Sequence, residues 1–164
     1  MRKKGKHSTV FLLGGFAIKI FSREVGVNAQ KEFRVLKKIK KFAFAPKPYF
    51  RLGRVVIMER VNGKNFKEMR EQEIRRKVPE FLLALNKLDK LRINKGENHR
   101  PLKHFIVTKN GIKLIDFERA NEGSHNVTQF LSYLNKFYFG IIKLGKKYRK
   151  NLDLRPILKF ISAK

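Results

Sequence analysis

Acidic residues are scarce in this chain, and two of them stand where a carboxylate could take part in chemistry. Asp116 ends an apolar run that is predicted to be a strand, and Glu97 lies in the polar loop before that hairpin. Because the two positions flank one hairpin, the carboxylates are expected to converge at its end. A carboxylate at a strand end can bind Mg²⁺ together with nucleotide phosphates. The pattern therefore predicts an ion or base site, although a strand-to-loop aspartate is also common without such a role.

Lys19 interrupts another apolar run, and Glu32 follows in a segment with helical spacing. In a chain with 40 Lys and Arg residues, a strand lysine most often faces solvent. The alternative is a buried ion pair, because Glu32 lies beside Phe33 near the apolar face of the expected helix. Such a pair holds a lysine at a strand edge and presents it to phosphates. The two interpretations make opposite predictions for the exposure of Lys19.

The first third of the chain is predicted to be rich in strands. Apolar runs flank Gly14-Gly15 and Gly53, and each pair of runs predicts a hairpin. Between the hairpins, a helix is expected with Asn28 as its N-cap and with lysines on its outer face. The four strands are expected over 9–13, 16–21, 49–52 and 55–59.

The rest of the chain is predicted to be mainly helical. Helical spacing runs from about residue 68 to 91, where Pro79 could split the helix into two pieces. A hairpin with strands at 104–108 and 112–116 is expected around Asn110-Gly111. The apolar pattern then predicts a long helix over 127–142 and a short one over 152–161.

Taken in this order, the motifs resemble those of the protein kinases. Residues 16–19, Phe-Ala-Ile-Lys, resemble the family's Val-Ala-Ile-Lys strand, and Glu32, or alternatively Glu24, resembles its helix-C glutamate. Residues 56–63 are similar to the hinge, where backbone groups bind adenine. Residues 114–118, Leu-Ile-Asp-Phe-Glu, resemble the Mg²⁺-binding Asp-Phe-Gly segment, with Glu in the third place as in atypical and aminoglycoside-type kinases.

Lys95-Gly96-Glu97 falls where small atypical kinases carry His-Gly-Asp. The resemblance covers about residues 5–120 and is closest in style to the small archaeal RIO and tRNA-modification-associated kinases. It implies an α+β, minimal bilobal protein-kinase-like fold with a small antiparallel-sheet N-lobe and a truncated helical C-lobe. The chain would form one domain over 1–164, with the N-lobe at 1–62 and the C-lobe at 63–164.

The resemblance also assigns roles to individual residues. The implied catalytic residues are Glu97, Lys19 and Asp116. The residues implied to bind ATP are Gly5, Lys19, Glu32, Glu59 and Val61. The implied Mg²⁺ ligands are Asp116 and His104.

The catalytic loop departs from the family pattern. Glu97 stands in place of the catalytic aspartate, and an alternative register would put Pro101 there instead. His104 stands where an asparagine should bind a second metal, and imidazole is a poor Mg²⁺ ligand, so Asn98 is an alternative. No activation segment of ordinary length follows Glu118.

Two functions from different classes follow from these features. The first is an ATP- and Mg²⁺-dependent phosphotransferase, a serine/threonine protein kinase acting on a protein or another hydroxyl acceptor. The second is a pseudokinase that serves as a basic RNA- or ribosome-binding module. Kinases of lipids and small molecules also carry Asp-Phe-Glu, so the acceptor of the phosphoryl group could instead be a lipid or a small molecule.

The charge balance bears on the partners of the chain. Its 164 residues carry a formal net charge of +27, which predicts an anionic partner or substrate. Basic clusters at 34–41, 75–77 and 143–150 are candidate nucleic-acid contacts, and Tyr148 lies within the last of them. The absence of Cys excludes a thiol nucleophile and a Cys-ligated zinc. No apolar run has the length of a transmembrane helix and no signal peptide is evident, so a cytoplasmic location is expected.

Overall fold

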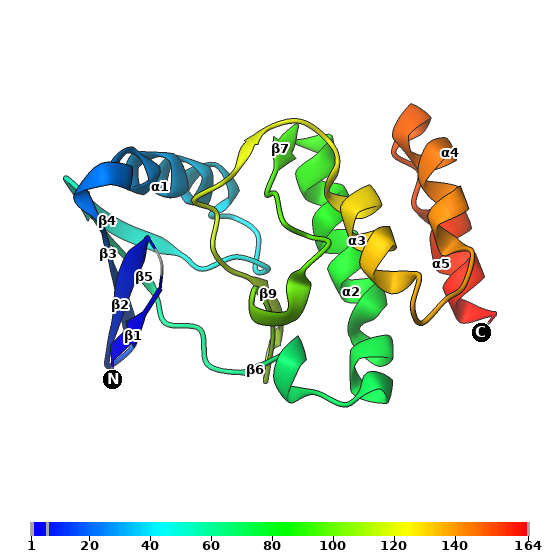
Figure 1. The fold of residues 1–164 in the computed structure, drawn as a ribbon, viewed down its shortest axis with the longest axis horizontal. Helices are drawn as coiled ribbons and strands as arrows, with labels where there is room; N and C mark the ends of the chain where they lie inside the picture. Colours follow the sequence, from blue (N-terminus) through cyan, green and yellow to red (C-terminus); the bar gives the residue numbers. More distant parts are fainter. Residues whose placement is uncertain (1, 6, 164) are drawn as a thin grey trace.

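The structure is a computed structural model that describes residues 2–5 and 7–163. A twisted antiparallel sheet forms one end of the elongated molecule, and most of the helices form the other end (Figure 1). The order of the strands in the sheet is β1-β2-β3-β5-β4. These strands are β1 (Arg2–Lys4), β2 (Ser8–Leu13), β3 (Phe16–Phe21), β4 (Pro48–Leu52) and β5 (Val55–Glu59). The sheet therefore consists of the two predicted hairpins with one further strand, β1, at its edge.

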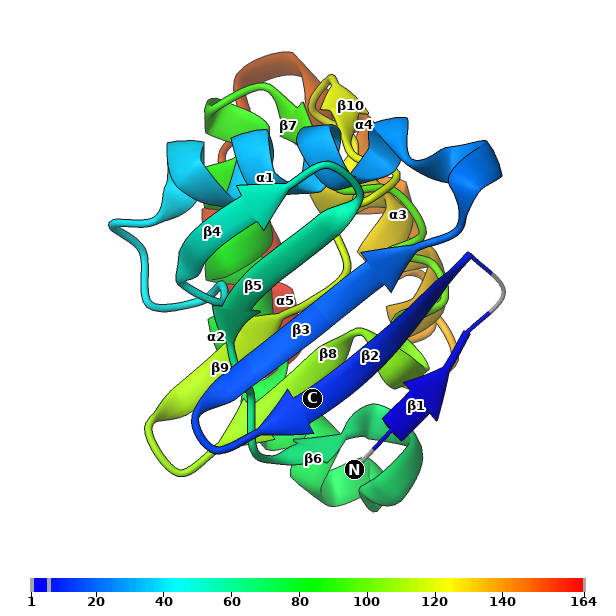
Figure 2. The ribbon, with the colours of Figure 1, turned by 90° about the vertical axis from the view of Figure 1, so that its left-hand side faces the viewer.

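Strand β3 lies at the centre of this sheet, and its side chains alternate between two environments. Ala17, Lys19 and Phe21 point to the buried side, whereas the residues between them are more exposed. Helix α1 (Val27–Ile39) covers part of that buried side, behind the sheet in Figure 2. The pleat of β3 is thus what turns Lys19 toward the interior.

Helix α1 presents one buried stripe to the sheet. Ala29, Glu32, Leu36 and Ile39 are spaced by three or four residues and are all buried. Glu32 is 1% exposed, although its neighbours in the stripe are apolar. The prediction that Asn28 caps this helix is wrong, because α1 begins at Val27 with Gly26 at the N-cap position and Asn28 lies inside the first turn.

The opposite end of the molecule consists of helices that pack around an aromatic core. The helices are α2 (Glu71–Lys90), α3 (Asn126–Leu134), α4 (Leu144–Asn151) and α5 (Arg155–Ser162). Phe66, Phe81, Phe105 and Phe130 are fully buried at the centre of this core. The ring centroids of Phe81 and Phe105 are 4.6 Å apart, and those of Phe105 and Phe130 are 5.0 Å apart. Contacts of this kind stabilise the core beyond the burial of apolar area.

Short strands and 3-10 turns link the longer elements of both ends. Strands β6, β8 and β9 form a three-stranded sheet, and β7 pairs with β10. Their bounds are β6 (Lys64–Asn65), β7 (Ile93–Asn94), β8 (Phe105–Thr108), β9 (Gly111–Leu114) and β10 (Asn121–Glu122). The 3-10 turns are η1 (Arg23–Val25), η2 (Phe66–Glu68), η3 (Pro101–Lys103) and η4 (Ile141–Lys143).

The prediction of one long helix over 127–142 is wrong. Helix α3 ends at Leu134, and the chain turns before η4. Gly140 has a φ of 84°, in the left-handed region, and its amide donates to the side chain of Asn135. The apolar spacing misled the prediction because Tyr138 and Ile141 are buried by this turn rather than by a continuing helix.

Pro79 does not split helix α2, which is continuous from Glu71 to Lys90. Proline removes one helical hydrogen bond and disfavours the preceding turn. Here Val78, Phe81 and Leu82 are fully buried on either side of it, and this packing maintains the helix. Within the described residues, no helix is both long and apolar enough to cross a membrane.

Candidate active site

Lys19 lies at the centre of a cluster of charges between the sheet, helix α1 and the segment after β9. Its Nζ is 2.9 Å from Oε2 of Glu32, 2.9 Å from Oδ1 of Asp116 and 3.0 Å from Oε2 of Glu118. Burial alone would lower the pKa of Lys19, but the carboxylates of Glu32, Asp116 and Glu118 outweigh it and raise that pKa. Lys19 is therefore a buried, permanently protonated cation, and it is not the solvent-facing lysine of the alternative interpretation.

Glu32 joins three elements through its two oxygens. Oε2 contacts Lys19, and Oε1 accepts a 2.9 Å hydrogen bond from the main-chain amide of Phe117. Complete burial raises the pKa of Glu32, and the charge of Lys19 opposes that effect. The other predicted candidate for this position, Glu24, is exposed at η1.

Asp116 directs its carboxylate toward both Lys19 and His104. The residue has a φ of 67°, in the left-handed region, where aspartate is more tolerated than most residues. Its Oδ2 is 3.5 Å from Nδ1 of His104, a buried atom with no hydrogen-bond partner among the described residues. Although burial opposes ionisation, the charge of Lys19 and its hydrogen bond lower the pKa of Asp116, with a smaller contribution from the charge of Lys95.

His104 is held in its neutral form. Burial lowers the pKa of His104, and the positive charge of Lys95 lowers it further. In the described part of the chain, no three His, Asp or Glu residues come together in a way that could hold a metal ion by themselves. A metal at Asp116 and His104 would therefore need most of its ligands from a substrate or from water.

The loop that carries Lys95 and Glu97 is anchored from the helical end. Oδ1 of Asn126 accepts hydrogen bonds from the amide of Lys95 at 2.7 Å and from Nδ2 of Asn98 at 2.8 Å. Nδ2 of Asn126 in turn donates to Asp89 and to the carbonyl of Ile93, both at 2.7 Å. Asn98, the alternative metal ligand, is fully buried and its Nδ2 donates into this network, whereas its Oδ1, the atom that could bind a metal, has no hydrogen-bond partner among the described residues.

Glu97 lies at the surface side of the same loop. It has a φ of 56°, and its Oε1 accepts an ion-paired hydrogen bond from Arg119. The carboxylate of Glu97 favours protonation of both Lys95 and His104 and so acts to raise the pKa of each, as the carboxylate of Asp116 does. The two predicted acids thus flank the same pair of basic side chains. Pro101, the other candidate for the position of Glu97, is buried at the start of η3.

The charge cluster opens into a cavity of about 290 Å³. One wall is apolar and includes Val10, Ala17, Met58 and Val61, and the far end holds Lys19, Glu32 and Asp116. Gly5, in the turn between β1 and β2, lies at the rim, where its amide donates to the carbonyl of Ser8 at 2.8 Å. An apolar slot that ends in charged groups can take a flat ring attached to an anion.

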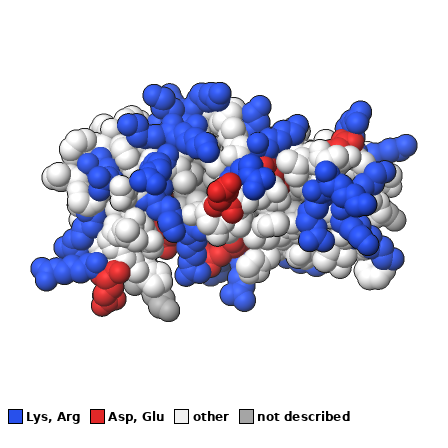
Figure 3. Space-filling model, turned by 90° about the horizontal axis from the view of Figure 1, so that it is seen from above, with Lys and Arg blue, Asp and Glu red and all other residues white. Residues whose placement is uncertain are grey.

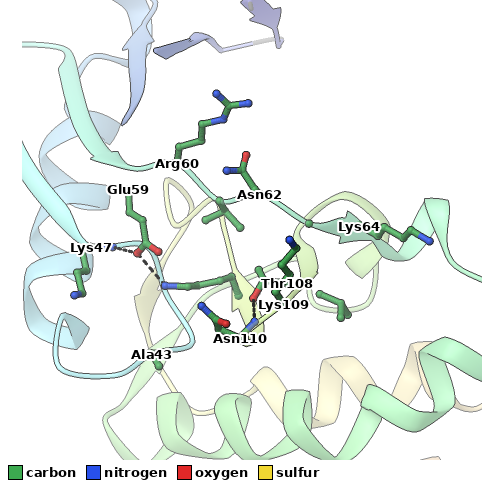
Figure 4. A pocket seen from close by; sticks show the side chains of 13 residues that line it. Ala43, Lys47, Glu59, Arg60, Asn62, Lys64, Thr108, Lys109 and Asn110 are labelled. Atoms are coloured by element: carbon green, nitrogen blue, oxygen red, sulfur yellow. Dashed lines mark hydrogen bonds and ion pairs between the residues drawn. The ribbon is translucent and has the colours of Figure 1, made fainter. Parts of the chain in front are cut away.

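A larger cavity of about 950 Å³ lies between the segment 59–64 and the turn that joins β8 to β9 (Figure 4). The carboxylate of Glu59 faces this larger cavity, where Oε2 accepts bonds from Nζ of Lys113 at 2.9 Å and the amide of Lys47 at 3.0 Å. Glu59 and Val61 line both cavities. The smaller cavity is the better candidate site because only it contains the Lys19 cluster.

Comparison with protein families identifies the chain. A family model described as the RIO domain matches residues 18–140, a span that includes Lys19, Glu32, Glu97 and Asp116. The chain belongs to the RIO family. A search of curated proteins gives no significant match to this RIO-family chain.

Solved structures agree with this assignment at the level of the fold. The Rio2 kinase from Chaetomium thermophilum, in an ADP/Mg²⁺-phosphoaspartate complex, aligns with a TM-score of 0.66 and 14% identity over 99% of this chain and 68% of that one. Another structure of the Rio2 kinase from Chaetomium thermophilum aligns with a TM-score of 0.63 and 12% identity over 90% of this chain and 56% of that one. The ADP-bound aminoglycoside phosphotransferase APH(2'')-Ib aligns with a TM-score of 0.56 and 12% identity over 98% of this chain and 89% of that one. The RIO-family chain therefore has the α+β, kinase-like fold that its sequence predicts.

The structure brings together most of the residues that the sequence singles out. Lys19, Glu32 and Asp116 are in direct contact, and Gly5, Glu59 and Val61 line the same cavity. The roles of three other residues were not predicted from their sequence context, and these residues are Glu118, Lys95 and Asn126. Glu118 occupies the third place of Asp-Phe-Glu, which marks the residue but not the direction of its side chain. No comparable signal marks Asn126, which lies about 30 residues from the loop that it anchors.

Proposed function

We propose that this RIO-family chain is an ATP- and Mg²⁺-dependent phosphotransferase that acts on the hydroxyl group of a serine or threonine in a protein. The observation that carries the proposal is the contact of Lys19 with both Glu32 and Asp116 at the end of an apolar cavity. A cation in that position can bind phosphate oxygens, and the apolar wall can hold adenine. The complex of the Rio2 kinase with ADP and Mg²⁺ supports the same interpretation.

In this proposal the nucleotide lies between an N-lobe at 1–62 and a C-lobe at 63–164. The main-chain carbonyl of Glu59 and the main-chain groups of Val61 would bind the adenine edge, because the amide of Glu59 already donates to the carbonyl of Lys47. The turn at Gly5 would cover the phosphates. Val61 has neither a main-chain nor a side-chain hydrogen bond to another described residue, so its amide and carbonyl are available. Lys19, held by Glu32, would contact the nucleotide phosphates.

Mg²⁺ fits the chemistry of the residues around Asp116. This ion keeps several water ligands and is usually bound through one or two carboxylates together with substrate phosphates. Asp116 supplies one carboxylate, and the neutral imidazole of His104 lies beside it as a second, weaker donor. Mg²⁺ bound there with ATP would neutralise phosphate charge.

The reaction itself is a displacement at phosphorus. The oxygen of the acceptor hydroxyl bonds to the γ-phosphorus of ATP while the bond from that phosphorus to the bridging oxygen breaks. The electron pair of the broken bond leaves with ADP. The hydroxyl proton passes to the carboxylate of Glu97, which must first release Arg119 or use its other oxygen. Catalysis of this type consists mostly of positioning and charge neutralisation.

The proposal is tested by nucleotide binding followed by phosphoryl transfer. Calorimetric titration with ADP and ATP, with and without Mg²⁺, should show binding that Mg²⁺ strengthens. Transfer of the γ-phosphoryl group to the chain or to a protein acceptor should fall about 10²–10³-fold in Lys19→Ala and Asp116→Ala. Asp153→Ala is the matched control, because Asp153 pairs with Arg155 at the start of α5. Undiminished transfer in Lys19→Ala and Asp116→Ala would refute the assignment.

A second candidate function is favoured by the distribution of charge on the surface. We propose that the basic side chains of α1 and α4 bind RNA, either alone or within a ribosome. Arg34, Lys37 and Lys38 are exposed on α1, and Lys146, Lys147, Arg149 and Lys150 are exposed on α4. The face seen in Figure 3 carries many basic and few acidic side chains. Tyr148 is 1% exposed and cannot stack on a base, so these contacts would be to phosphates.

Salt dependence separates this candidate from the first. RNA affinity should fall steeply as the salt concentration rises. In a plot of the logarithm of the binding constant against the logarithm of the salt concentration, the magnitude of the slope should decrease by about one for each phosphate contact removed. Lys146→Glu with Lys147→Glu should weaken RNA binding and leave ADP binding unchanged. RNA affinity that does not respond to salt or to these substitutions would rule the candidate out.

A further inference from the structure

Lys95 is a second lysine in the interior of the site. It is 2% exposed, and its Nζ lies 5.6 Å from the centroid of the Phe117 ring. Its main-chain amide is fixed by Asn126, so the side chain starts from a rigid point. Among the residues that the structure describes, no group accepts a hydrogen bond from Nζ of Lys95 or forms an ion pair with it.

Burial of an unpaired lysine side chain lowers the stability of the fold. An ammonium group taken out of water without a partner costs several kcal/mol, and an apolar side chain of similar size would avoid that cost. Burial lowers the pKa of Lys95 to about 8, so the protonated form still predominates at neutral pH. A buried cation with no partner has its hydrogen-bonding capacity available for a ligand.

The surroundings of Lys95 indicate where that ligand would lie. Asp116, Glu32 and Glu97 attract its charge, and Lys19 and His104 lie close enough to interact with it as well. The side chain of Lys95 therefore lies near two carboxylates, that of Asp116, which is proposed to hold Mg²⁺, and that of Glu97, which is proposed to accept the hydroxyl proton. In the proposed reaction the transferred phosphoryl group must pass between those two carboxylates.

The charge balance of the cluster gives a second reason. Three carboxylates surround Lys19, so this group is net negative before any phosphate arrives. A triphosphate would bring further negative charge to the same place. Mg²⁺ offsets part of that charge, and the cation of Lys95 is free to offset more because it is not already paired.

We propose that Lys95 is a further catalytic residue whose ammonium group donates hydrogen bonds to the terminal phosphoryl group of ATP. This inference rests on the proposed phosphotransferase function. During transfer the phosphorus–oxygen bonds change as described above, the hydroxyl proton goes to Glu97, and Lys95 keeps its own protons. Its charge offsets the charge on the equatorial oxygens of the transition state and involves no reorganisation, because the side chain is already fixed.

The proposal is tested by comparing ATP and ADP affinities, because only ATP carries the group that Lys95 would contact. In Lys95→Met, which keeps the volume and removes the charge, ATP affinity should fall about tenfold while ADP affinity stays within about twofold. Lys95→Arg should recover part of the ATP affinity. The turnover of Lys95→Met should fall about 10²-fold.

Lys103→Met is the matched control, since it makes the same change at an exposed lysine nearby in η3 and should alter neither affinity. The melting temperature of Lys95→Met should not fall, because an unpaired buried charge has been removed. Should Lys95→Met fail to fold, Lys95→Gln takes its place in the same comparison.

Each outcome decides the proposal. Equal losses of ATP and ADP affinity with a lower melting temperature would assign Lys95 to packing against Phe117, and unchanged affinities would also overturn the inference. If the wild-type chain binds ADP and only the inference about Lys95 fails, the proposed function stands. If the wild-type chain binds neither nucleotide, both proposals fail together.

Discussion

The main-chain amide of Phe117 donates a 2.9 Å hydrogen bond to Oε1 of Glu32, across 85 positions of the chain. The other oxygen of the same carboxylate contacts Lys19. One buried side chain of α1 therefore fixes both the lysine of β3 and the segment that carries Asp116. Any displacement of α1 would change the position of Lys19 and the backbone after β9 together.

Glu32→Gln should weaken both stability and nucleotide binding. The amide oxygen of glutamine can still accept from Phe117, but its NH₂ group would then face the Lys19 ammonium. Because a buried pair is broken while Asp116 and Glu118 still contact Lys19, the free energy of unfolding should fall by about 2 kcal/mol. ATP affinity should fall about tenfold because Lys19 is no longer held from α1. Urea denaturation and calorimetric titration measure the two effects.

Glu24→Gln is the control for this prediction, because Glu24 is exposed at η1 and was the alternative partner for Lys19. It should change stability by less than about 0.5 kcal/mol and leave ATP affinity unaltered. Equal effects of the two substitutions would show that the pair between Glu32 and Lys19 has no special role.

Sequence patterns predicted the parts of the site that depend on regular structure. The period of a helix placed Glu32 near the apolar face of α1, whereas the strand pattern left two opposite predictions for Lys19, and the structure shows the buried one. The direction of Glu118 could not be predicted, because it depends on the left-handed backbone of Asp116. Residues with positive φ reverse the expected alternation of side chains, and nothing in the sequence requires that conformation at an aspartate.

The burial of Lys95 could not be predicted from local sequence patterns, for a different reason. In a polar loop next to Gly96 and Glu97, a lysine is expected at the surface. Its burial follows from the anchoring of its amide by Asn126, a contact between segments 31 residues apart. The long helix expected after residue 127 failed because apolar spacing does not reveal a turn that buries the same side chains.

The Glu59 carboxylate should make stability depend on pH in the acid range. Burial of Glu59 opposes ionisation, but its hydrogen bonds from Lys113 and from the amide of Lys47 outweigh this and lower its pKa below the ordinary 4.5. A lowered pKa means that the stabilisation is complete above about pH 4.5 and is lost as the pH falls through the folded-state value. The free energy of unfolding of the wild type should exceed that of Glu59→Gln by about 0.5–1 kcal/mol at pH 7. This difference should disappear near pH 3.

Urea denaturation of both proteins at a series of pH values measures this difference. Glu122→Gln serves as the control, since Glu122 pairs with Arg92 at the surface and both side chains are mostly exposed. That substitution should have little effect at any pH. A gap between wild type and Glu59→Gln that persists unchanged to pH 3 would contradict the assignment of Glu59 as the ionised partner of Lys113.

Gly63→Ala should displace the segment that joins the two ends of the molecule. A Cβ atom at Gly63 would overlap the carbonyl oxygen of Val107 and lie 2.9 Å from Cγ2 of Ile106. Backbone atoms of β8 cannot move aside easily, so the free energy of unfolding should fall by about 2–4 kcal/mol. Gly15→Ala is the control, because a Cβ there meets no atom within 4 Å. Similar unfolding curves for the two variants would show that the close approach of Gly63 to β8 is not required.

Asn126→Ala should release the loop that carries Lys95 and Glu97. The substitution removes the acceptor of the Lys95 amide and the donor to Asp89, and it leaves buried polar groups unpaired on both sides. The free energy of unfolding should fall by about 3 kcal/mol, and amide hydrogen exchange over residues 93–98 should accelerate. Phosphoryl transfer should fall more than ADP affinity does, because the loop bears on the transferred group rather than on adenine.

Asn126→Asp separates the loss of the anchor from the loss of packing. An aspartate keeps the acceptor for the Lys95 amide, but it places a second carboxylate beside Asp89, which already accepts bonds from two main-chain amides and from Tyr148. Like charges buried at that distance repel, so Asn126→Asp should also be destabilised, and lowering the pH should restore part of its stability because protonation of either carboxyl removes the repulsion. Asn121→Ala, at an exposed position of β10, should change neither exchange nor transfer. If exchange over 93–98 were equally slow in all three variants, the loop would be held by contacts other than Asn126.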